Sequence, residues 1–248
     1  ENGNPQTGQI FILGQPRSGT TLVDRILSAH PDVASLGEVN DVAYAVIRSG
    51  HPTQSKSELI ERSAAADMKT LGQEIWAAFK GYGETAPYLI DKTPANFLYL
   101  GLIAKALPNA RIIHMKRHPM ASGFAMFKTL FRMGYPFSYD LEDIGHYYAS
   151  YHRLMPHWHG LFPGRILDIQ NDALVDAQET LRRQSVAHCG REWNEACLNF
   201  HKNSAPTATA SAAQVRQPLY RSARDLWRAH EADLRRLARI LEQEGIPC

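Results

Sequence analysis

The chain has 248 residues, of which 44% are hydrophobic and 21% are charged, and its formal net charge is +2 at pH 7. This composition is typical of a globular protein with enough apolar side chains for a sizeable core. The near-neutral charge, without a run of five or more like charges, argues against nucleic acid as a partner. The longest apolar runs are only strand-sized, so the sequence predicts no membrane span and a cytoplasmic location.

The three cysteines, Cys189, Cys197 and Cys248, lie in the last quarter of the chain without C-x-x-C spacing. This arrangement predicts free thiols in a reducing compartment. The chain begins with Glu1 and not with methionine, which suggests an excised domain, for example one that follows an N-terminal module, or a processed product. We expect a single domain over residues 1–248.

Short β-rich runs alternate with longer helical patterns, which is typical of βαβ units around a parallel sheet. Strands are predicted at residues 9–13, 88–90, 111–115 and 165–169. Helices are predicted at residues 20–29, 96–106, 122–131, 140–156 and 174–188. Residues 203–213 are small and polar, which predicts a loop, and leucines at helical spacing from Leu226 to Leu241 predict a last helix.

Residues 14–21, with the sequence GQPRSGTT, follow the first predicted strand and fit the P-loop pattern except that Thr20 replaces its lysine. That lysine reaches the β- and γ-phosphates of a nucleoside triphosphate, so this loop should hold another phosphate-bearing ligand. Backbone amides, the helix dipole and the hydroxyls of Ser18, Thr20 and Thr21 favour an anion, and Arg17 adds a cation. An ordinary tight turn between strand and helix is the alternative.

Two further predicted strands end in cations, Lys92 after Asp91 and Arg117 after Lys116. Because ligands of open α/β sheets collect at the carboxyl ends of the strands, Arg17, Lys92 and Arg117 should lie at one edge. A nucleoside triphosphatase often has a magnesium-binding aspartate at such a strand end, so Arg117 favours a second phosphate over a metal. A solvated basic turn is the alternative for either strand end alone. The predicted fold is α/β, with a P-loop-like central parallel sheet flanked by helices and a mainly helical C-terminal part.

Several ordered segments resemble the sulfotransferases that use 3′-phosphoadenosine 5′-phosphosulfate as donor. They are PRSGTTL (16–22), HPDV (30–33), GE (37–38), DKTP (91–94), NAR (109–111) and RHP (117–119). The sequence is most similar to the tyrosylprotein sulfotransferases and to bacterial sulfotransferase domains that often follow tetratricopeptide repeats. The likeness continues through SAAQVRQPLY (211–220) and Trp227, so it covers nearly the whole chain.

The resemblance implies in-line transfer of a sulfuryl group from this donor to the hydroxyl of a peptide tyrosine, a sugar, or a small alcohol or phenol. It implies that Glu38 is the base and that Lys92, Ser211 and Arg17 stabilise the transition state. Without the resemblance, Glu38 would be interpreted as a helix-capping or solvated carboxylate. The residues expected to hold the donor are Arg17, Ser18, Gly19, Thr20, Thr21, Arg117, Ser122, Lys128, Tyr220 and Arg221.

Three of these follow from departures from the family pattern. Ala125 stands where the family has a serine, so Ser122 and Lys128 are the candidates for that contact. Leu226 stands before Trp227 where a cation is common, so Arg221 or Arg224 is the candidate there.

Other functional classes stay open. A catalytically inactive nucleotide-binding or sensor module is favoured by Ala125 and by Asn171, which replaces a tyrosine of the family pattern. A small-molecule kinase is disfavoured by the missing P-loop lysine. No metal is predicted, because His146, His152, His157 and His159 are accompanied by no acid or cysteine at a recurring spacing. The expected partner is the acceptor, and a homodimer is compatible with the sequence.

Overall fold

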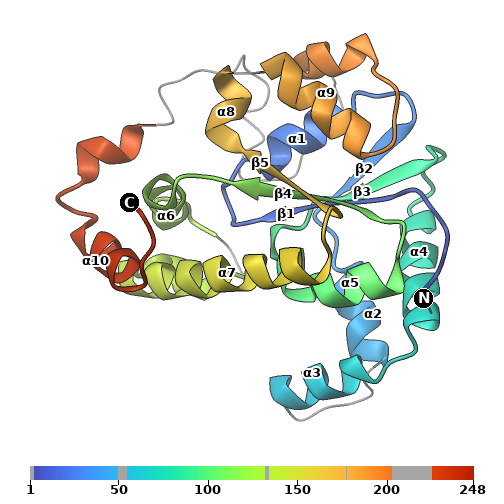
Figure 1. The fold of residues 1–248 in the computed structure, drawn as a ribbon, viewed down its shortest axis with the longest axis horizontal. Coiled ribbons are helices and arrows are strands. Elements are labelled where there is room, and N and C mark those ends of the chain that lie inside the picture. Colours follow the sequence, from blue (N-terminus) through green and yellow to red (C-terminus); the bar gives the residue numbers. More distant parts are fainter. Residues whose placement is uncertain (1–2, 50–54, 132–133, 177, 203–224) are drawn as a thin grey trace.

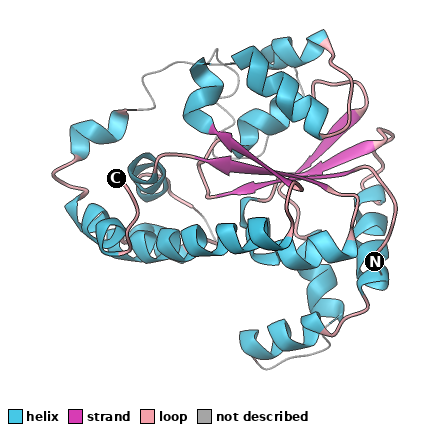
Figure 2. Cartoon of the chain, viewed as in Figure 1, coloured by secondary structure: helices cyan, strands magenta, loops and turns pink. Residues whose placement is uncertain are grey.

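The structure is a computed structural model that describes residues 3–49, 55–131, 134–176, 178–202 and 225–248. Among these residues, parallel strands form one five-stranded sheet in the order β2-β3-β1-β4-β5, with helices on both faces (Figures 1 and 2). The strands are β1 (Gln9–Gly14), β2 (Val33–Gly37), β3 (Tyr88–Asp91), β4 (Arg111–Lys116) and β5 (Ile166–Gln170). This arrangement confirms the predicted α/β fold with a central parallel sheet flanked by helices.

One face of the sheet is covered by α1 (Thr20–Leu27), α8 (Asn171–Asp176) and α9 (Gln178–His188), the upper layer in Figure 1. The 3₁₀ helix η3 (Glu195–Lys202) packs against α1. Apolar side chains of β1 and β4 meet those of α1 beneath this layer, and Ile10, Ile12, Ile26 and Ile113 are almost completely buried there. Both faces of β1 are covered, which explains its unbroken apolar run.

The other face carries a longer set of helices, the lower layer in Figure 1. In chain order these are α2 (Asp41–Ser49), α3 (Lys56–Ala64), α4 (Met68–Lys80), η1 (Pro94–Tyr99), α5 (Leu100–Ala106) and α7 (Leu141–Leu161). Helix α6 (Pro119–Phe127) follows β4 and lies level with the sheet in Figure 1, and both α6 and η2 (Pro136–Tyr139) pack against α7. Two C-terminal helices follow, η5 (Leu226–His230) and α10 (Arg235–Gln243), and α10 packs on α7. None of the described helices is both long enough and apolar enough to span a membrane.

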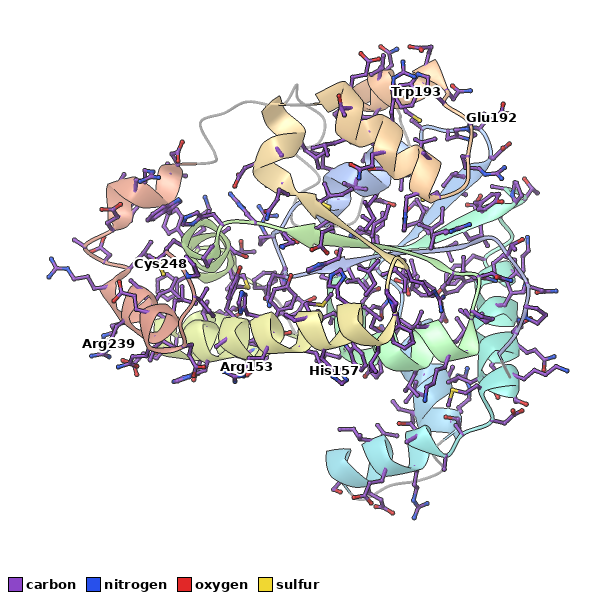
Figure 3. The ribbon with its side chains drawn as sticks, in the orientation of Figure 1. Arg153, His157, Glu192, Trp193, Arg239 and Cys248 are labelled. Atoms are coloured by element: carbon purple, nitrogen blue, oxygen red, sulfur yellow. The ribbon has the colours of Figure 1, made fainter. Side chains whose placement is uncertain are left out.

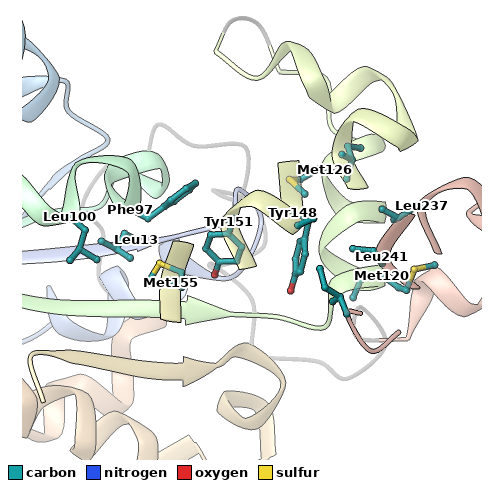
Figure 4. Packing of buried hydrophobic residues seen from close by; sticks show 14 of the residues in the cluster. Leu13, Phe97, Leu100, Met120, Met126, Tyr148, Tyr151, Met155, Leu237 and Leu241 are labelled. Carbon is teal, nitrogen blue, oxygen red and sulfur yellow. The ribbon is translucent and has the colours of Figure 1, made fainter. Parts of the chain in front are cut away.

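Helix α7 shows how the lower layer is held. Arg153 and His157 are exposed on its outer side, away from the sheet (Figure 3). Tyr148, Tyr151 and Met155 recur at helical spacing on its inner side and pack into the cluster shown in Figure 4. Burial of each such large side chain stabilises the fold by roughly 1.5–3 kcal/mol. This inner face therefore fixes α7 beneath the sheet.

The four predicted strands are confirmed to within one residue, whereas β2 is not among the predicted elements. The predicted helix end at Pro156 is wrong, because α7 continues through it to Leu161. An interior proline costs a helix one hydrogen bond and a clash with the preceding turn. The continued helix is anchored by Trp158 Nε1, which donates to Phe97 O at 2.9 Å.

Other boundaries also differ from prediction. The helix expected at 122–131 begins earlier, at Pro119, and ends at Phe127, and the one expected at 174–188 is two helices, α8 and α9. The helix expected at 96–106 starts as the 3₁₀ helix η1. Residues 203–213, predicted as a loop, lie outside the described residues. The three cysteines are free, as predicted.

Candidate functional site

The turn between β1 and α1 has an unusual backbone. Gly14, Arg17 and Gly19 have φ values of 145°, 68° and 102°, and Arg17 is the one non-glycine residue with positive φ in the described part of the chain. A Cβ atom on Gly14 would lie 2.5 Å from Met115 O, and one on Gly19 would lie 2.4 Å from Asn171 Oδ1. Glycine is therefore required at both positions. Such left-handed turns before a helix N-terminus form anion-binding concavities, and the strain at Arg17 costs about 1–3 kcal/mol.

A second loop, after β4, supports this turn. Arg117 Nη1 donates to the carbonyl oxygen of Arg17 at 2.9 Å, so the strained peptide is held from the neighbouring strand. Tyr148 of α7 in turn donates to Arg117 O at 3.3 Å. The next residue, His118, stacks on Trp227 with ring centroids 5.0 Å apart. The two loops thus form one connected structure at the carboxyl edge of the sheet.

Three cations converge at this edge. Burial lowers the pKa of Arg17, Arg117 and Lys128. The charges of Arg17 and Arg117 lower the pKa of Lys128 further, and Arg17 lowers that of Arg117, against the opposing effect of Asp172. These cations are close enough to destabilise one another, so a bound anion would relieve their repulsion. The cluster is a candidate anion site.

Hydroxyl groups add donors to the same loops. Ser18 lies in the first loop and Ser122 in the first turn of α6, and both are almost completely buried. Their Oγ atoms have no hydrogen-bond partner among the described residues. Gly19, Thr20 and Thr21 form the start of α1, and the N-terminus of a helix favours an anion. A buried hydroxyl without a partner carries a free-energy cost that a ligand oxygen would remove.

The ends of β2 and β3 are joined by hydrogen bonds and carry an ion pair. Lys92 N donates to Gly37 O at 2.9 Å, and Thr93 Oγ1 exchanges hydrogen bonds with the backbone of Val39. Lys92 Nζ lies 2.6 Å from Glu38 Oε1. The lysine side chain is 1% exposed and the glutamate side chain is 42% exposed. The pair therefore presents a carboxylate to solvent with a fixed cation behind it.

A buried acid of α1, Asp24, lies near the same lysine. Burial raises the pKa of Asp24, while a hydrogen bond from Ser35 and the charges of Lys92 and Arg25 oppose that rise. Asp24 and Glu38 thus both lie near Lys92. Sequence reasoning missed Asp24, although a lone acid on the helix after a phosphate-binding loop is a recognisable signal.

The residue before the lysine, Asp91, holds the turn in place. Its two oxygens accept hydrogen bonds from Thr93 N at 2.9 Å and from Asn96 Nδ2 at 2.8 Å. Burial raises the pKa of Asp91 to about 7. Because both oxygens are engaged within the turn, Asp91 has a structural role in aiming Lys92. The DKTP motif includes this residue, but its role could not be deduced from the motif.

An aromatic wall stands near the carboxylate. Burial raises the pKa of Tyr135, and the charge of Glu38 raises it further, so Tyr135 lies within electrostatic range of Glu38. Phe131 contacts Tyr135 at a centroid distance of 4.9 Å, and Phe137 contacts it at 6.0 Å and stacks on Tyr147. Tyr135 was not among the predicted site residues. Its position near Glu38 is set by tertiary structure and has no local sequence signal.

The predicted site residues thus fall into two neighbouring groups along the carboxyl edge. Arg17, Arg117 and Lys128 gather around the first and fourth strands, while Glu38 and Lys92 meet at the second and third. Three predicted residues lie outside the described part of the chain: Ser211, Tyr220 and Arg221.

Comparison with known proteins gives a consistent result. Residues 9–195 match the model of the sulfotransferase family. The chain is 34% identical to an uncharacterized protein of Aquifex aeolicus (strain VF5) over 98% of its own length and 33% of that protein. It is 25% identical to the protein-tyrosine sulfotransferase of Drosophila melanogaster over 90% of its own length and 48% of that protein. The chain therefore spans between a third and a half of the length of these curated relatives.

The fold is also shared with a solved structure. The sulfotransferase domain from the Synechococcus PCC 7002 olefin synthase superposes with a TM-score of 0.67 at 20% identity. The alignment covers 100% of this chain and 98% of that domain. On the sequence match over most of its length, this chain belongs to the sulfotransferase family.

Proposed function

We propose that this chain transfers a sulfuryl group from 3′-phosphoadenosine 5′-phosphosulfate to an acceptor hydroxyl. The observation that carries the proposal is the 2.6 Å ion pair between Lys92 Nζ and Glu38 Oε1, at the same sheet edge as the strained loop of Arg17. An acceptor bound there would meet a solvent-facing base backed by a buried cation. Membership of the sulfotransferase family supports the identity of the donor.

The two loops suit the two ends of this donor. The turn of residues 14–21 offers amides and hydroxyls to the 5′-phosphosulfate, and Thr20 in place of lysine fits a ligand without a triphosphate. Arg117, Ser122 and Lys128 would hold the 3′-phosphate. Because Arg117 also binds the carbonyl of Arg17, a donor that bridges both loops would fix the strained turn from two sides. Tyr220 and Arg221 remain proposed nucleotide contacts.

In the proposed reaction, the acceptor oxygen attacks sulfur in line with the bridging oxygen of the phosphosulfate. The acceptor proton passes to the Glu38 carboxylate, the new S–O bond forms, and the bond from sulfur to the bridging oxygen breaks. The electron pair leaves with 3′-phosphoadenosine 5′-phosphate. Lys92, Arg17 and the proposed Ser211 stabilise charge on the bridging and sulfuryl oxygens. No metal is needed for this charge balance.

The aromatic wall of Tyr135, Phe131 and Phe137 supports an acceptor hydroxyl carried on an aromatic ring. Edge contacts with such a ring would add about 0.5–1.5 kcal/mol each to binding. A tyrosine side chain or a small phenol fits this surface better than a sugar does. The protein-tyrosine sulfotransferase named among the relatives is consistent with that choice.

Calorimetry with two nucleotides tests the donor assignment. We expect binding of 3′-phosphoadenosine 5′-phosphate and none of ATP. Arg117→Gln should weaken the former about tenfold to a hundredfold, because a charge-assisted contact is lost. Arg153→Gln is the matched control, since Arg153 is an exposed arginine on the outer side of α7. Equal binding of ATP would instead support a kinase.

Transfer is tested separately with donor labelled in its sulfuryl group and a panel of phenols, tyrosine peptides, sugars and alcohols. Label should appear on an aromatic hydroxyl. If the chain binds the nucleotide but transfers label to no acceptor and not to water, the enzyme proposal fails and the sensor alternative is supported.

A further inference from the structure

Three side chains with metal-binding groups meet at the β5 edge of the sheet, away from the β2 and β3 strand ends that carry the proposed base. In the parallel register of β4 and β5, His114 and Asp168 are direct partners. His114 Nδ1 lies 2.8 Å from Asp168 Oδ1, and His159 Nε2 of α7 lies 2.9 Å from the same oxygen. The three donor atoms all lie within 4.8 Å of one another. Strand register and one helix thus bring together residues that are distant in sequence.

This set has the composition of a transition-metal site. Imidazole nitrogen and carboxylate oxygen bind Zn(II) at about 2.0–2.2 Å, which places tetrahedral ligands about 3.4 Å apart. The two separations from Asp168 Oδ1, 2.8 and 2.9 Å, are shorter than this, so moving Asp168 away from the histidines by about half an ångström would admit the ion. His159 and Asp168 have side chains that are each 35% exposed, so they have freedom to make that change.

The environment of the buried ligand also fits. The side chain of His114 is 3% exposed, and its second ring nitrogen, Nε2, contacts the hydroxyl of Tyr151. Metal-binding histidines nearly always use their second nitrogen in such a contact, which fixes the ring orientation and the tautomer. In this arrangement Nδ1 is directed to Asp168 and is the nitrogen available to a metal.

A groove gives access to the cluster. It has a volume of about 610 Å³ and runs from His114 and Asp168 past the end of β4 to Ile246 and Pro247. Its lining also includes His152. An ion held by three protein ligands would therefore have a fourth position open to water or to a ligand in the groove.

We propose that His114, His159 and Asp168 form a binding site for a divalent transition-metal ion such as Zn(II), with its fourth position facing the groove. The site lies apart from Glu38 and Lys92, but its groove is also lined by Arg117, the proposed 3′-phosphate contact. It would link β4, β5 and α7. Lys116 is its internal competitor, because Lys116 Nζ lies 3.2 Å from the second oxygen of Asp168.

Calorimetric titration of the chelator-treated full chain, free of any histidine tag, with Zn(II) tests the proposal. One ion per chain should bind, and tetrahedral Co(II) should give visible absorption at the same stoichiometry. His159→Gln and Asp168→Asn should each weaken binding by at least about tenfold. Zn(II) should raise the melting temperature of the wild type and not that of His159→Gln, because a ligand that binds the native state stabilises it.

His157→Gln is the matched control, since His157 lies on the same helix but is exposed on the outer side of α7 (Figure 3). It should bind Zn(II) as the wild type does. Lys116→Gln should bind Zn(II) more tightly, because it removes a cation next to a ligand. The proposal is overturned if the wild type binds no stoichiometric ion or if His159→Gln and His157→Gln bind equally well. An unchanged Zn(II) affinity in Lys116→Gln would also overturn the proposal, because it would indicate that Asp168 does not bind the metal.

Discussion

Replacing Glu38 with glutamine separates the proposed catalytic role of this residue from its structural role. In the wild type, Lys92 Nζ lies 2.6 Å from Glu38 Oε1. The substitution keeps the size of the side chain and an oxygen that can accept a hydrogen bond from Lys92 Nζ. It removes the ability to take a proton together with the negative charge that pairs with Lys92. The cations around the nucleotide loops are not touched by this change.

The structure sets the expected magnitudes. Loss of a general base slows a reaction about 10²–10⁴-fold, which corresponds to about 3–5 kcal/mol of barrier. The effect on stability should be smaller, because the Glu38 side chain is 42% exposed and the glutamine oxygen can still accept a hydrogen bond from Lys92 Nζ. Transfer should therefore fall far more than the free energy of unfolding does.

The assay compares Glu38→Gln with Glu74→Gln. Glu74 is a good control because its side chain is 39% exposed and its carboxylate pairs with Arg48 at 3.3 Å. Sulfuryl transfer, affinity for 3′-phosphoadenosine 5′-phosphate and urea unfolding are measured for both variants. Only Glu38→Gln should lose transfer, and both should keep nucleotide affinity. Transfer by Glu38→Gln within threefold of the control would refute the assignment of the base.

Three further predictions concern the backbone and a buried acid. Arg17→Gly should weaken nucleotide binding and change the free energy of unfolding, measured in urea, by less than about 1 kcal/mol. Relief of backbone strain should offset the greater conformational entropy of glycine in the unfolded chain, so a large loss of stability would contradict this prediction. Gly14→Ala should lower the free energy of unfolding by about 2 kcal/mol or more, and clearly more than Gly83→Ala, whose new Cβ would meet no atom within 4 Å. Asp91 has a pKa of about 7 in the native chain and about 3.9 in the unfolded chain. Between these pH values the native chain binds more protons than the unfolded chain does, so the free energy of unfolding should fall as the pH rises from about 4 to about 7. Thermal melts across that range should show this fall in the wild type and a flatter profile in Asp91→Asn; identical slopes would exclude Asp91 as its source.

Strands buried on both faces could be predicted from sequence because their apolar runs are local and nearly continuous. Every residue of β1 is buried. A glycine-bearing turn follows this strand directly in the sequence, and this order of elements predicts the candidate anion site. β2 could not be predicted in this way, because it is an edge strand with a single buried residue, Val33. The helices α2, α3 and α4 are also not among the predicted elements. Local pattern thus identifies the centre of the sheet better than its margin.

Site chemistry was less predictable than the strands that carry it. The three strand-end cations follow from parallel topology, since Arg17, Lys92 and Arg117 each come directly after a strand or within its following turn. The ion pair of Lys92 with Glu38 depends instead on hydrogen bonds between two turns, through Thr93 and Val39. No spacing in the sequence encodes that contact, and only family resemblance suggested a role for Glu38. The bond from Arg117 to the strained peptide of Arg17 is equally invisible in sequence.

The histidines of α7 show why sequence proximity misleads most strongly at side-chain clusters. His157 and His159 form an H-x-H pattern, but residues two apart on an α-helix point about 200° away from each other. Only His159 reaches the sheet, where strand register has already paired His114 with Asp168. The acid that the sequence pattern lacks is thus supplied by β5, and a second imidazole by β4. Parallel register, and not the spacing of histidines along the chain, decides which nitrogens can share one ion.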